Sequence, residues 1–261
     1  MKGIYNRIYS DFLLPSRLDE YDNLCKKALQ KGYFFKTLTD YYHQLDQPNL
    51  DQKVFLHRHD IDTDIKTAER FFRVEEANGI KTSYYFRLST IDVPLMKAIN
   101  AAGHEVGYHF EEIAQYCKDY NVHGWEKVTD RMPDIQKRFI DNFLNLEQQL
   151  GFKIRSVVSH GDFVNRKLGH QNYELLTPAI REQLGIEMEG YDEKLIASFN
   201  YVQSDATFPK FYRKPEHPLQ AIEKGYSVIH LLTHPRHWHR APWENLKDNC
   251  MRLVEGFRYR K

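Results

Sequence analysis

Residues 53–86 read KVFLHRHDIDTDIKTAERFFRVEEANGIKTSYYF, and this stretch decides the fold. It opens with an apolar, strand-like segment that reaches Asp60. A segment with the apolar spacing of a helix follows, with Asp64 as its expected N-cap, and runs to Asn78. Gly79 then suits the left-handed conformation just past a helix end, and SYYF is again strand-like. Strand, helix and strand in this order predict two parallel strands joined by a helix.

The same succession of a charged helical stretch, a glycine and a β-branched or aromatic stretch recurs along the chain. The glycines are Gly32, Gly79, Gly103, Gly151, Gly185 and Gly225. Strand-like segments after them include HEVGYHF, FKIRSVVS and YSVIHLL, and shorter ones lie around IEMEGY and SFNYVQ. Counting KVFLHRH, about seven strands alternate with helices, which is enough for a barrel or an open sheet. We predict an α/β fold in the form of a distorted (β/α) barrel of about seven parallel strands.

No Pro/Gly/Ser-rich linker, low-complexity tract or fixed repeat divides the sequence, so we predict a single domain. A long amphipathic helix over 125–150 should be kinked or split at Pro133. The single domain covers 1–261, and its expected parts are a helical preface or extension (1–50), the barrel (53–239) and a closing helix (243–261).

The charge balance excludes one large class of function. With 37 basic and 36 acidic side chains the formal net charge is +1, so the chain lacks the excess of basic residues that binding to nucleic acid requires. No apolar run approaches the roughly 20 residues of a membrane span, and the first residues do not read as a signal peptide. The cysteines (Cys25, Cys117 and Cys250) form no CxxC and suit a reducing compartment. We expect a cytoplasmic protein.

Ionisable residues recur where the predicted strands end. They are Asp60 and Asp62 after KVFLHRH, Arg87 after SYYF, His109 after HEVGY, His160 after IRSVVS, and His234 after YSVIHLL and the following Thr. The carboxyl ends of parallel strands meet at one edge, where barrels and open α/β sheets carry their chemistry. The pattern therefore predicts one site that contains all of these side chains.

The segment HRHDIDTD indicates a metal at this site. Asp60 and Asp62 are two residues apart, so their carboxylates share a face of an extended strand, where they repel each other unless a cation or proton lies between them. His109 adds a neutral imidazole. Imidazole with carboxylate is ordinary zinc ligation in a site that keeps one position open for water.

These residues, in this order, resemble the polysaccharide deacetylase family, the NodB-homology domain of carbohydrate esterases. The resemblance covers roughly residues 53–239 and implies the same distorted (β/α) barrel, here NodB-like. It implies that Asp60 is the catalytic base and Asp62 a metal ligand. It identifies His109 with the first His of the family's HxxxH motif, and His234, at the end of LLTH, with the general acid.

The sequence departs from the family at the second metal histidine, because Ile113 stands four residues after His109. A third ligand must come from elsewhere. His160, in the segment SHG, is the first choice, and Glu112 is the second. The forms HDxD, GHExGYHxE, HG and HPxxW also resemble a branch of the family associated with bacterial surface-glycan biosynthesis, which implies a sugar substrate.

The leading hypothesis is therefore a metal-dependent hydrolase that removes an N-acyl group, acetyl or formyl, from an amino sugar, with zinc as the expected divalent ion. Substrate-binding candidates follow from side-chain chemistry: Arg58, Arg87 and Arg236 suit the phosphate or carboxylate of a nucleotide- or lipid-linked sugar, and Trp238 suits a sugar ring.

Two alternatives stay open. His57 and His59 form an HxH pair like that of amidohydrolase-like or PHP-type phosphoesterase barrels, although an extended strand cannot point this pair and the two aspartates to the same side. The other alternative is a non-catalytic sugar-binding or assembly protein that kept the fold after losing the second metal histidine.

Overall fold

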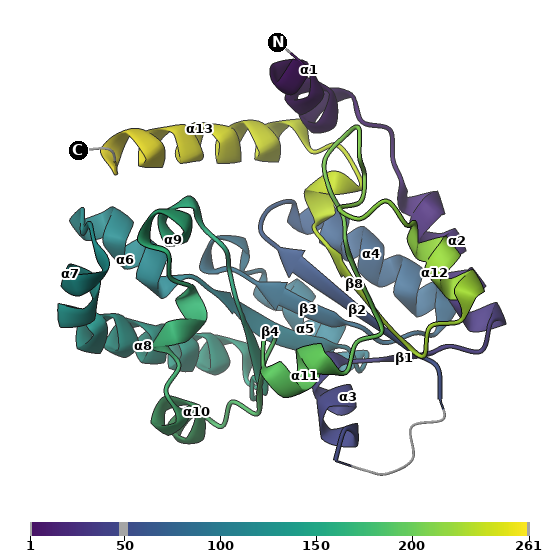
Figure 1. The fold of residues 1–261 in the computed structure, drawn as a ribbon, viewed down its shortest axis with the longest axis horizontal. Helices are drawn as coiled ribbons and strands as arrows, with labels where there is room; N and C mark the ends of the chain where they lie inside the picture. Colours follow the sequence, from purple (N-terminus) through teal and green to yellow (C-terminus); the bar gives the residue numbers. More distant parts are fainter. Residues whose placement is uncertain (1, 47–51, 260–261) are drawn as a thin grey trace.

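The computed structural model describes residues 2–46 and 52–259, and a curled parallel sheet forms its centre (Figure 1). The strand order is β6-β5-β4-β3-β2-β8-β7, and β1 pairs with the start of β2 beside β3. All of the pairs between these strands are parallel. The strands are β1 (Phe34–Lys36), β2 (Val54–Ile61), β3 (Ser83–Phe86), β4 (Glu105–Phe110), β5 (Ser156–Ser159), β6 (Met188–Glu189), β7 (Tyr201–Ser204) and β8 (Val228–Thr233).

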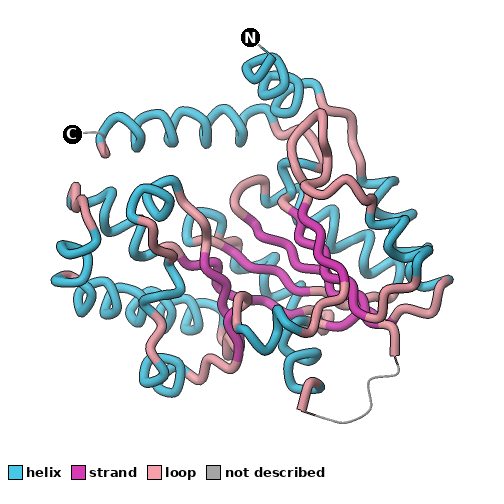
Figure 2. The backbone as a smooth tube through the Cα atoms, viewed as in Figure 1, coloured by secondary structure: helices cyan, strands magenta, loops and turns pink. Residues whose placement is uncertain are grey.

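Helices connect the strands and lie around the sheet, as the tube in Figure 2 shows. The α-helices are α1 (Lys2–Ile8), α2 (Leu18–Gln30), α3 (Leu38–Gln44), α4 (Ile65–Asn78), α5 (Val93–Ala101), α6 (Glu112–Tyr120), α7 (Trp125–Asp130), α8 (Met132–Leu150), α9 (Phe163–Leu168), α10 (Pro178–Leu184), α11 (Glu193–Ala197), α12 (Pro218–Lys224) and α13 (Pro242–Arg258). Shorter turns of helix are η1 (Tyr9–Leu13), η2 (Leu88–Thr90), η3 (Asn172–Leu175) and η4 (Pro235–His237).

Two apolar cores lie on opposite faces of the sheet. Successive side chains of a strand point to opposite faces. In β2, Phe55 belongs to the large core between the sheet and helices such as α4, whereas Val54 and Leu56 belong to the smaller core on the other face. Tyr85 and Val158 join that smaller core from β3 and β5. By the same alternation, Asp60 and Asp62 at the end of β2 are expected on one face of the sheet.

The structure confirms the predicted distorted (β/α) barrel, in the form of an open, curled sheet of the NodB-like kind. Asp64 caps α4 by accepting a hydrogen bond from the backbone N–H of Thr67, and the predicted long helix is split into α7 and α8 next to Pro133. The glycines predicted to end helices adopt positive φ: Gly32, Gly79, Gly103, Gly151, Gly185 and Gly225.

The predicted helical preface contains α1, α2 and α3, and also one short strand, β1, that was not predicted. Phe34, Phe35 and Lys36 pair with the first residues of β2. A three-residue strand is too short to show the alternation by which strands are predicted from sequence.

The last helix, α13, crosses the molecule from the side of α1 to the side of α6 (Figure 1). Arg236 ties its first half to η1 through ion pairs with Asp248 and Asp11, and Lys118 of α6 pairs with Glu255. Among the described residues, no helix combines the length and apolar character needed to cross a bilayer.

Candidate active site

Three of the predicted metal ligands lie together at the carboxyl edge of the sheet. Asp62 directly follows β2, His109 is on β4, and His160 follows β5. The backbone N–H of His160 donates to the carbonyl of Phe110 at 2.7 Å, which continues the pairing of β4 with β5 beyond its last strand residue. One ligand atom from each of the three side chains lies within 4.8 Å of the other two.

The spacing of these atoms fits a tetrahedral metal. The Oδ1 atom of Asp62 is 3.3 Å from Nε2 of His109 and 3.6 Å from Nε2 of His160. A zinc ion with N and O ligands at about 2.0–2.2 Å separates two ligand atoms by about 3.3–3.6 Å. Oδ1 of Asp62 is also a buried oxygen that accepts no hydrogen bond. An unsatisfied carboxylate oxygen beside two imidazole nitrogens is the arrangement that a divalent cation completes.

Hydrogen bonds on the far side of each imidazole orient it. Nδ1–H of His109 donates to the carbonyl oxygen of Val158 at 2.9 Å, so Nε2 is the nitrogen that faces Asp62. Nδ1 of His160 lies 3.1 Å from Oε2 of Glu111, the residue after β4. A carboxylate or carbonyl partner of this kind is the usual support of a metal-binding histidine.

Charge around His160 favours a cation. Burial lowers the pKa of His160, but the carboxylates of Asp62 and Glu111 outweigh it and raise that pKa to about 9. Arg87 in turn binds Glu111, with its Nε 3.0 Å from Oε1. Burial opposes ionisation of Glu111, yet its hydrogen bond to His160 and the charge of Arg87 hold its pKa well below the usual range.

The predicted base, Asp60, lies beside this cluster and is held by Arg58. Oδ2 of Asp60 is 3.5 Å from Nε2 of His109. Nε and Nη2 of Arg58 donate to the two carboxylate oxygens of Asp60, each at 2.7 Å. Burial raises the pKa of Asp60, but the charge of Arg58 outweighs burial and lowers it below the ordinary value, so the carboxylate is ionised near neutral pH.

The predicted acid, His234, is bound by Asp205. Its backbone N–H and its Nδ1–H donate to the two oxygens of Asp205, both at 2.7 Å. The indole N–H of Trp238 donates to the same carboxylate at 2.8 Å. Burial lowers the pKa of His234, but the charge and hydrogen bond of Asp205 raise it to about 9. Because Nδ1 is occupied, Nε2 is the atom that can give a proton to a ligand.

Glu112, the second choice for the third ligand, lies elsewhere. It is buried against α8, where it accepts hydrogen bonds from the hydroxyl of Tyr108, from Asn142 at 3.0 Å and from the backbone N–H of Glu111 at 3.1 Å. Ile113, at the place of the family's second histidine, is buried in the large core between the sheet and the helices. Of the two candidates, His160 is the one beside Asp62 and His109.

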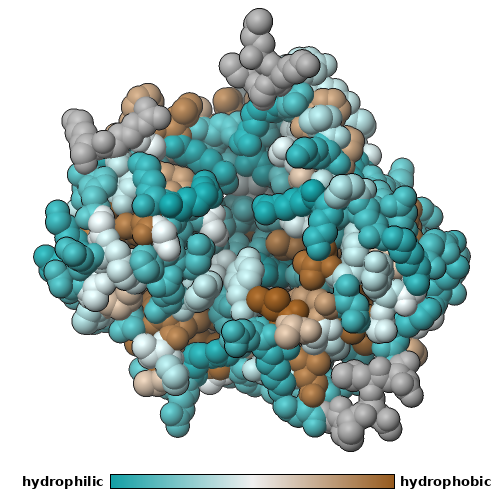
Figure 3. Space-filling view, in the orientation of Figure 1, coloured by the Kyte–Doolittle hydropathy of each residue, from teal (hydrophilic) through white to brown (hydrophobic). Residues whose placement is uncertain are grey.

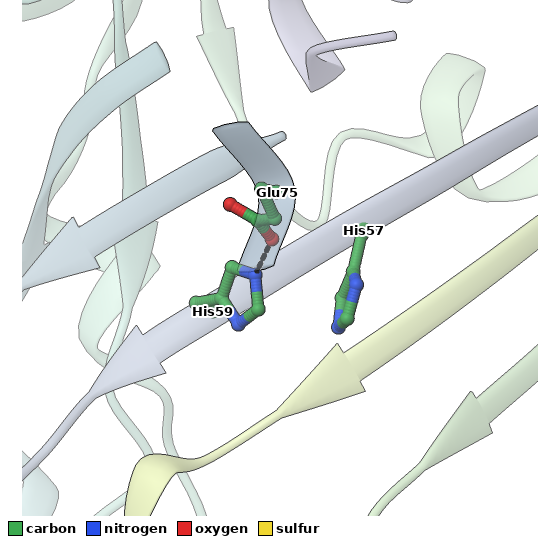
Figure 4. A group of neighbouring side chains, drawn as sticks. All are labelled: His57, His59 and Glu75. Carbon is green, nitrogen blue, oxygen red and sulfur yellow. Dashed lines mark hydrogen bonds and ion pairs between the residues drawn. The ribbon is translucent and has the colours of Figure 1, made fainter. Parts of the chain in front are cut away.

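The HxH pair of the alternative hypothesis is buried, in a group with Glu75 whose ligand atoms lie within 4.8 Å of one another. His57 and His59 lie on the opposite face of β2 from Asp60, because alternate residues of a strand point to opposite faces. Both lie beside Glu75 (Figure 4). None of these three side chains is exposed to solvent. A pair of histidines sealed from solvent in this way cannot meet a substrate.

The predicted substrate-binding residues all have partners within the protein. Arg58 is buried on Asp60, Arg87 binds Glu111, and Arg236 is buried between Asp11 and Asp248. Trp238 is 0% exposed, so it cannot stack on a sugar in this structure. The sequence shows that these side chains suit anions or rings, but it does not show that acidic neighbours within the protein already occupy the arginines.

Two residues of the site were absent from the sequence prediction. Asp205 directly follows β7, and Glu111 directly follows β4. The rule that gathers polar residues at the carboxyl ends of strands applies to both and would have identified them. Tyr191 follows β6 by two residues in the same way, and its hydroxyl is 3.2 Å from Nη2 of Arg58. The face drawn in Figure 3 is hollowed near its centre, with hydrophilic residues along much of the rim and a hydrophobic group beside it.

Comparisons with known proteins give similarities of fold. No protein-family model and no curated protein matches the sequence. Among solved structures, the Streptococcus pyogenes deacetylase PplD in complex with acetate is 13% identical, with 88% of this chain and 85% of that chain covered and a TM-score of 0.48. BA3943, a CE4 family pseudoenzyme from Bacillus anthracis, is 10% identical, with 80% and 62% covered and a TM-score of 0.38. A BA3943 mutant with restored enzymatic activity is 11% identical, with 80% and 64% covered and the same TM-score.

Proposed function

We propose that the protein is a metal-dependent hydrolase that removes an N-acyl group, acetyl or formyl, from an amino sugar. The observation that carries the proposal is the convergence of Asp62, His109 and His160 beside an ionised carboxylate, Asp60, and a protonated imidazole, His234. Amide hydrolysis needs a base for water, an acid for the leaving amine and a means of polarising the carbonyl.

Asp62, His109 and His160 are the residues that would hold the metal, and zinc is the ion we propose. When bound, a zinc ion lowers the pKa of water and polarises a carbonyl group. The contribution of the chain is to orient the ligands: Val158 and Glu111 fix the two imidazole rings through their Nδ1 atoms.

Asp60 is the proposed general base. Its carboxylate is ionised, lies next to the ligand cluster and is not one of the three ligands. Arg58 holds both of its oxygens, which keeps the carboxylate in place as it accepts a proton from water and offsets the cost of its burial.

His234 is the proposed general acid. Asp205 holds the ring through Nδ1 and keeps it protonated, so Nε2–H is available to the departing nitrogen. Protonation of that nitrogen matters because an amine anion is a very poor leaving group.

Two exposed tyrosines suit an amino sugar better than the buried Trp238. Tyr191 and Tyr173 are each 43% exposed, and their ring centroids are 6.4 Å apart. The hydroxyl of Tyr191 contacts Arg58, which places this ring close to Asp60. We propose that they contact the sugar of a nucleotide- or lipid-linked substrate, in cytoplasmic synthesis of a surface glycan.

The test is release of acetate or formate from N-acetyl and N-formyl amino sugars by the zinc-loaded protein. We expect Asp60→Asn and His234→Gln each to lower kcat by about 10²- to 10⁴-fold, the usual contribution of a general base or acid. Release of neither acid by the zinc-loaded wild type from free, nucleotide-linked and lipid-linked sugars would overturn the proposal and favour a non-catalytic sugar-binding protein.

A further inference from the structure

Five buried side chains form a closed ring of hydrogen bonds on the outer face of the sheet. Tyr21 of α2 donates to Glu75 of α4, and its hydroxyl is 2.9 Å from Nδ1 of His57. Nε2 of His57 is 3.1 Å from the hydroxyl of Thr233, which is 2.7 Å from Nδ1 of His59. Nε2 of His59 closes the ring on the same oxygen of Glu75 at 2.7 Å. None of the five side chains is exposed to solvent.

The ring leaves no atom for a metal or a substrate. Tyr21 donates to Glu75, so Nδ1–H of His57 donates to Tyr21 and Nε2 accepts from Thr233. The hydroxyl oxygen of Thr233 also lies 2.7 Å from Nδ1 of His59, whose Nε2 is 2.7 Å from the Glu75 carboxylate. Thus both nitrogens of His57 and of His59 are already engaged. The separation of 2.7 Å between His59 and Glu75 is that of a hydrogen bond and is shorter than two ligands of one zinc ion allow.

The position of Thr233 in the sheet connects this ring of hydrogen bonds to the proposed active site. His59 and Thr233 are paired across β2 and β8 and form the last register pair between these two strands. The next residues along the two strands are Asp60 and His234, the proposed base and acid. Pro235 follows at once, so β8 cannot be held by further backbone pairing beyond this point.

We infer that Thr233 is a positioning residue. Its hydroxyl links His57 and His59 of β2 to the end of β8, and so holds Asp60 and His234 at a fixed separation. The inference rests on the proposed roles of Asp60 and His234. Proton transfers at both residues require heavy atoms within hydrogen-bond reach, and a shift of about 1 Å can cost about 100-fold in rate.

The experiment compares Thr233→Val, which keeps the shape and removes the hydroxyl, with Thr233→Ser, which restores it. Thr82→Val is the matched control, because the Thr82 hydroxyl donates to the other oxygen of Glu75 at 2.9 Å but precedes β3 at the amino end of the sheet. The measurements are kcat and KM for N-acyl amino-sugar hydrolysis, bound zinc, and hydrogen exchange of the His234 amide, which donates to Asp205.

We expect Thr233→Val to lower kcat about 10- to 100-fold with KM changed less than about threefold. Thr233→Ser should recover most of the loss, while bound zinc stays as in the wild type. Exchange of the His234 amide should become faster in Thr233→Val and stay unchanged in Thr82→Val.

A wild-type kcat in Thr233→Val, or an equal loss in Thr82→Val, would overturn the positioning role. If the wild type hydrolyses no N-acyl sugar, the proposed function fails, and hydrogen exchange alone decides whether Thr233 holds the end of β8. Unchanged protection of the His234 amide in Thr233→Val would then overturn the inference.

Discussion

Arg58 and Asp60 lie two residues apart on one strand, and the guanidinium of the first binds both carboxylate oxygens of the second at 2.7 Å. Both side chains are almost fully buried. Gly190 makes room for this pair, since a Cβ atom there would lie 3.2 Å from Nη1 of Arg58 and 2.6 Å from a methyl carbon of Val158. The proposed base is thus supported from within its own strand.

The Arg58–Asp60 pair should be costly to break from one side. Arg58→Met leaves a buried carboxylate without its partner, which typically lowers the free energy of unfolding by about 3–5 kcal/mol. The double variant Arg58→Met/Asp60→Asn should lose less than the sum of the two single variants, by about 0.5–3 kcal/mol, in urea denaturation. Strict additivity of the two substitutions would show that the pair is not coupled.

The pH dependence should report the Asp205–His234 pair. A proton donor acts only while protonated, so kcat/KM should hold below a pH of about 9 and fall as the pH rises through the pKa of His234. Asp205→Asn removes the charge that opposes burial, so the alkaline limb should move toward the ordinary histidine value of about 6.5 or below.

The same pair has a signature in stability. Because the pKa of His234 is raised in the folded protein, its stabilising contribution is complete below about pH 6.5 and is lost as the pH rises to about 9. This loss should be smaller in Asp205→Asn when unfolding is measured across that range, because only His160 then keeps a pKa raised to about 9. In the activity measurements, a fall of kcat/KM that stays at the same alkaline pH in Asp205→Asn would contradict the assignment of His234 as the acid.

Two glycines of the site should differ sharply in tolerance to alanine. At Gly107, two residues before His109, a Cβ atom would lie 2.4 Å from a ring carbon of Tyr85 and 2.7 Å from the carbonyl oxygen of Ser156. Overpacking of this kind costs about 1–3 kcal/mol or more. At Gly161 a Cβ atom meets nothing within 4 Å, so alanine should change stability by less than about 0.5 kcal/mol.

Thermal unfolding of Gly107→Ala and Gly161→Ala makes the comparison. Equal melting temperatures for the two variants would contradict the packing described around β4. Gly161 does not adopt positive φ, so its backbone does not require a glycine either.

The role of Glu111 in orienting the proposed metal ligand His160 can be tested by substitution. Removing the charge of this carboxylate in Glu111→Gln should weaken zinc binding by about 10- to 100-fold, because Glu111 orients His160 without touching the metal. Glu112→Gln is the matched control, since its side chain faces α8. Competition with a chelator measures the zinc affinity of both variants. Equal zinc affinity in the two variants would remove Glu111 from the site.

Sequence reasoning succeeded where a local rule decides the structure. A glycine after a helical stretch, an aspartate before one and polar residues at strand ends each reflect the physics of a few neighbouring residues, and they gave the barrel and the grouping of Asp62, His109 and His160. The rule also covers Asp205, which directly follows β7 and was overlooked although the strand-like segment around SFNYVQ was recognised.

Sequence reasoning failed where the answer depends on distant partners. Arg236 meets Asp11 from the start of the chain, and Trp238 meets Asp205. Neither contact can be recognised from the spacing of residues in the sequence. Arg236 and Trp238 were therefore predicted to bind the substrate. The choice between His160 and Glu112 was also undecided, because only the helix packing that buries Glu112 against Asn142 separates them.

Metal content tests the central claim most directly. After loading with zinc and removal of excess, elemental analysis of the wild type should find about one ion per chain. Asp62→Ala, His109→Ala and His160→Ala should each lose it, whereas Glu112→Gln and His57→Gln should retain it if folded by circular dichroism. A wild type that binds no divalent ion, or full occupancy in His160→Ala, would contradict the account.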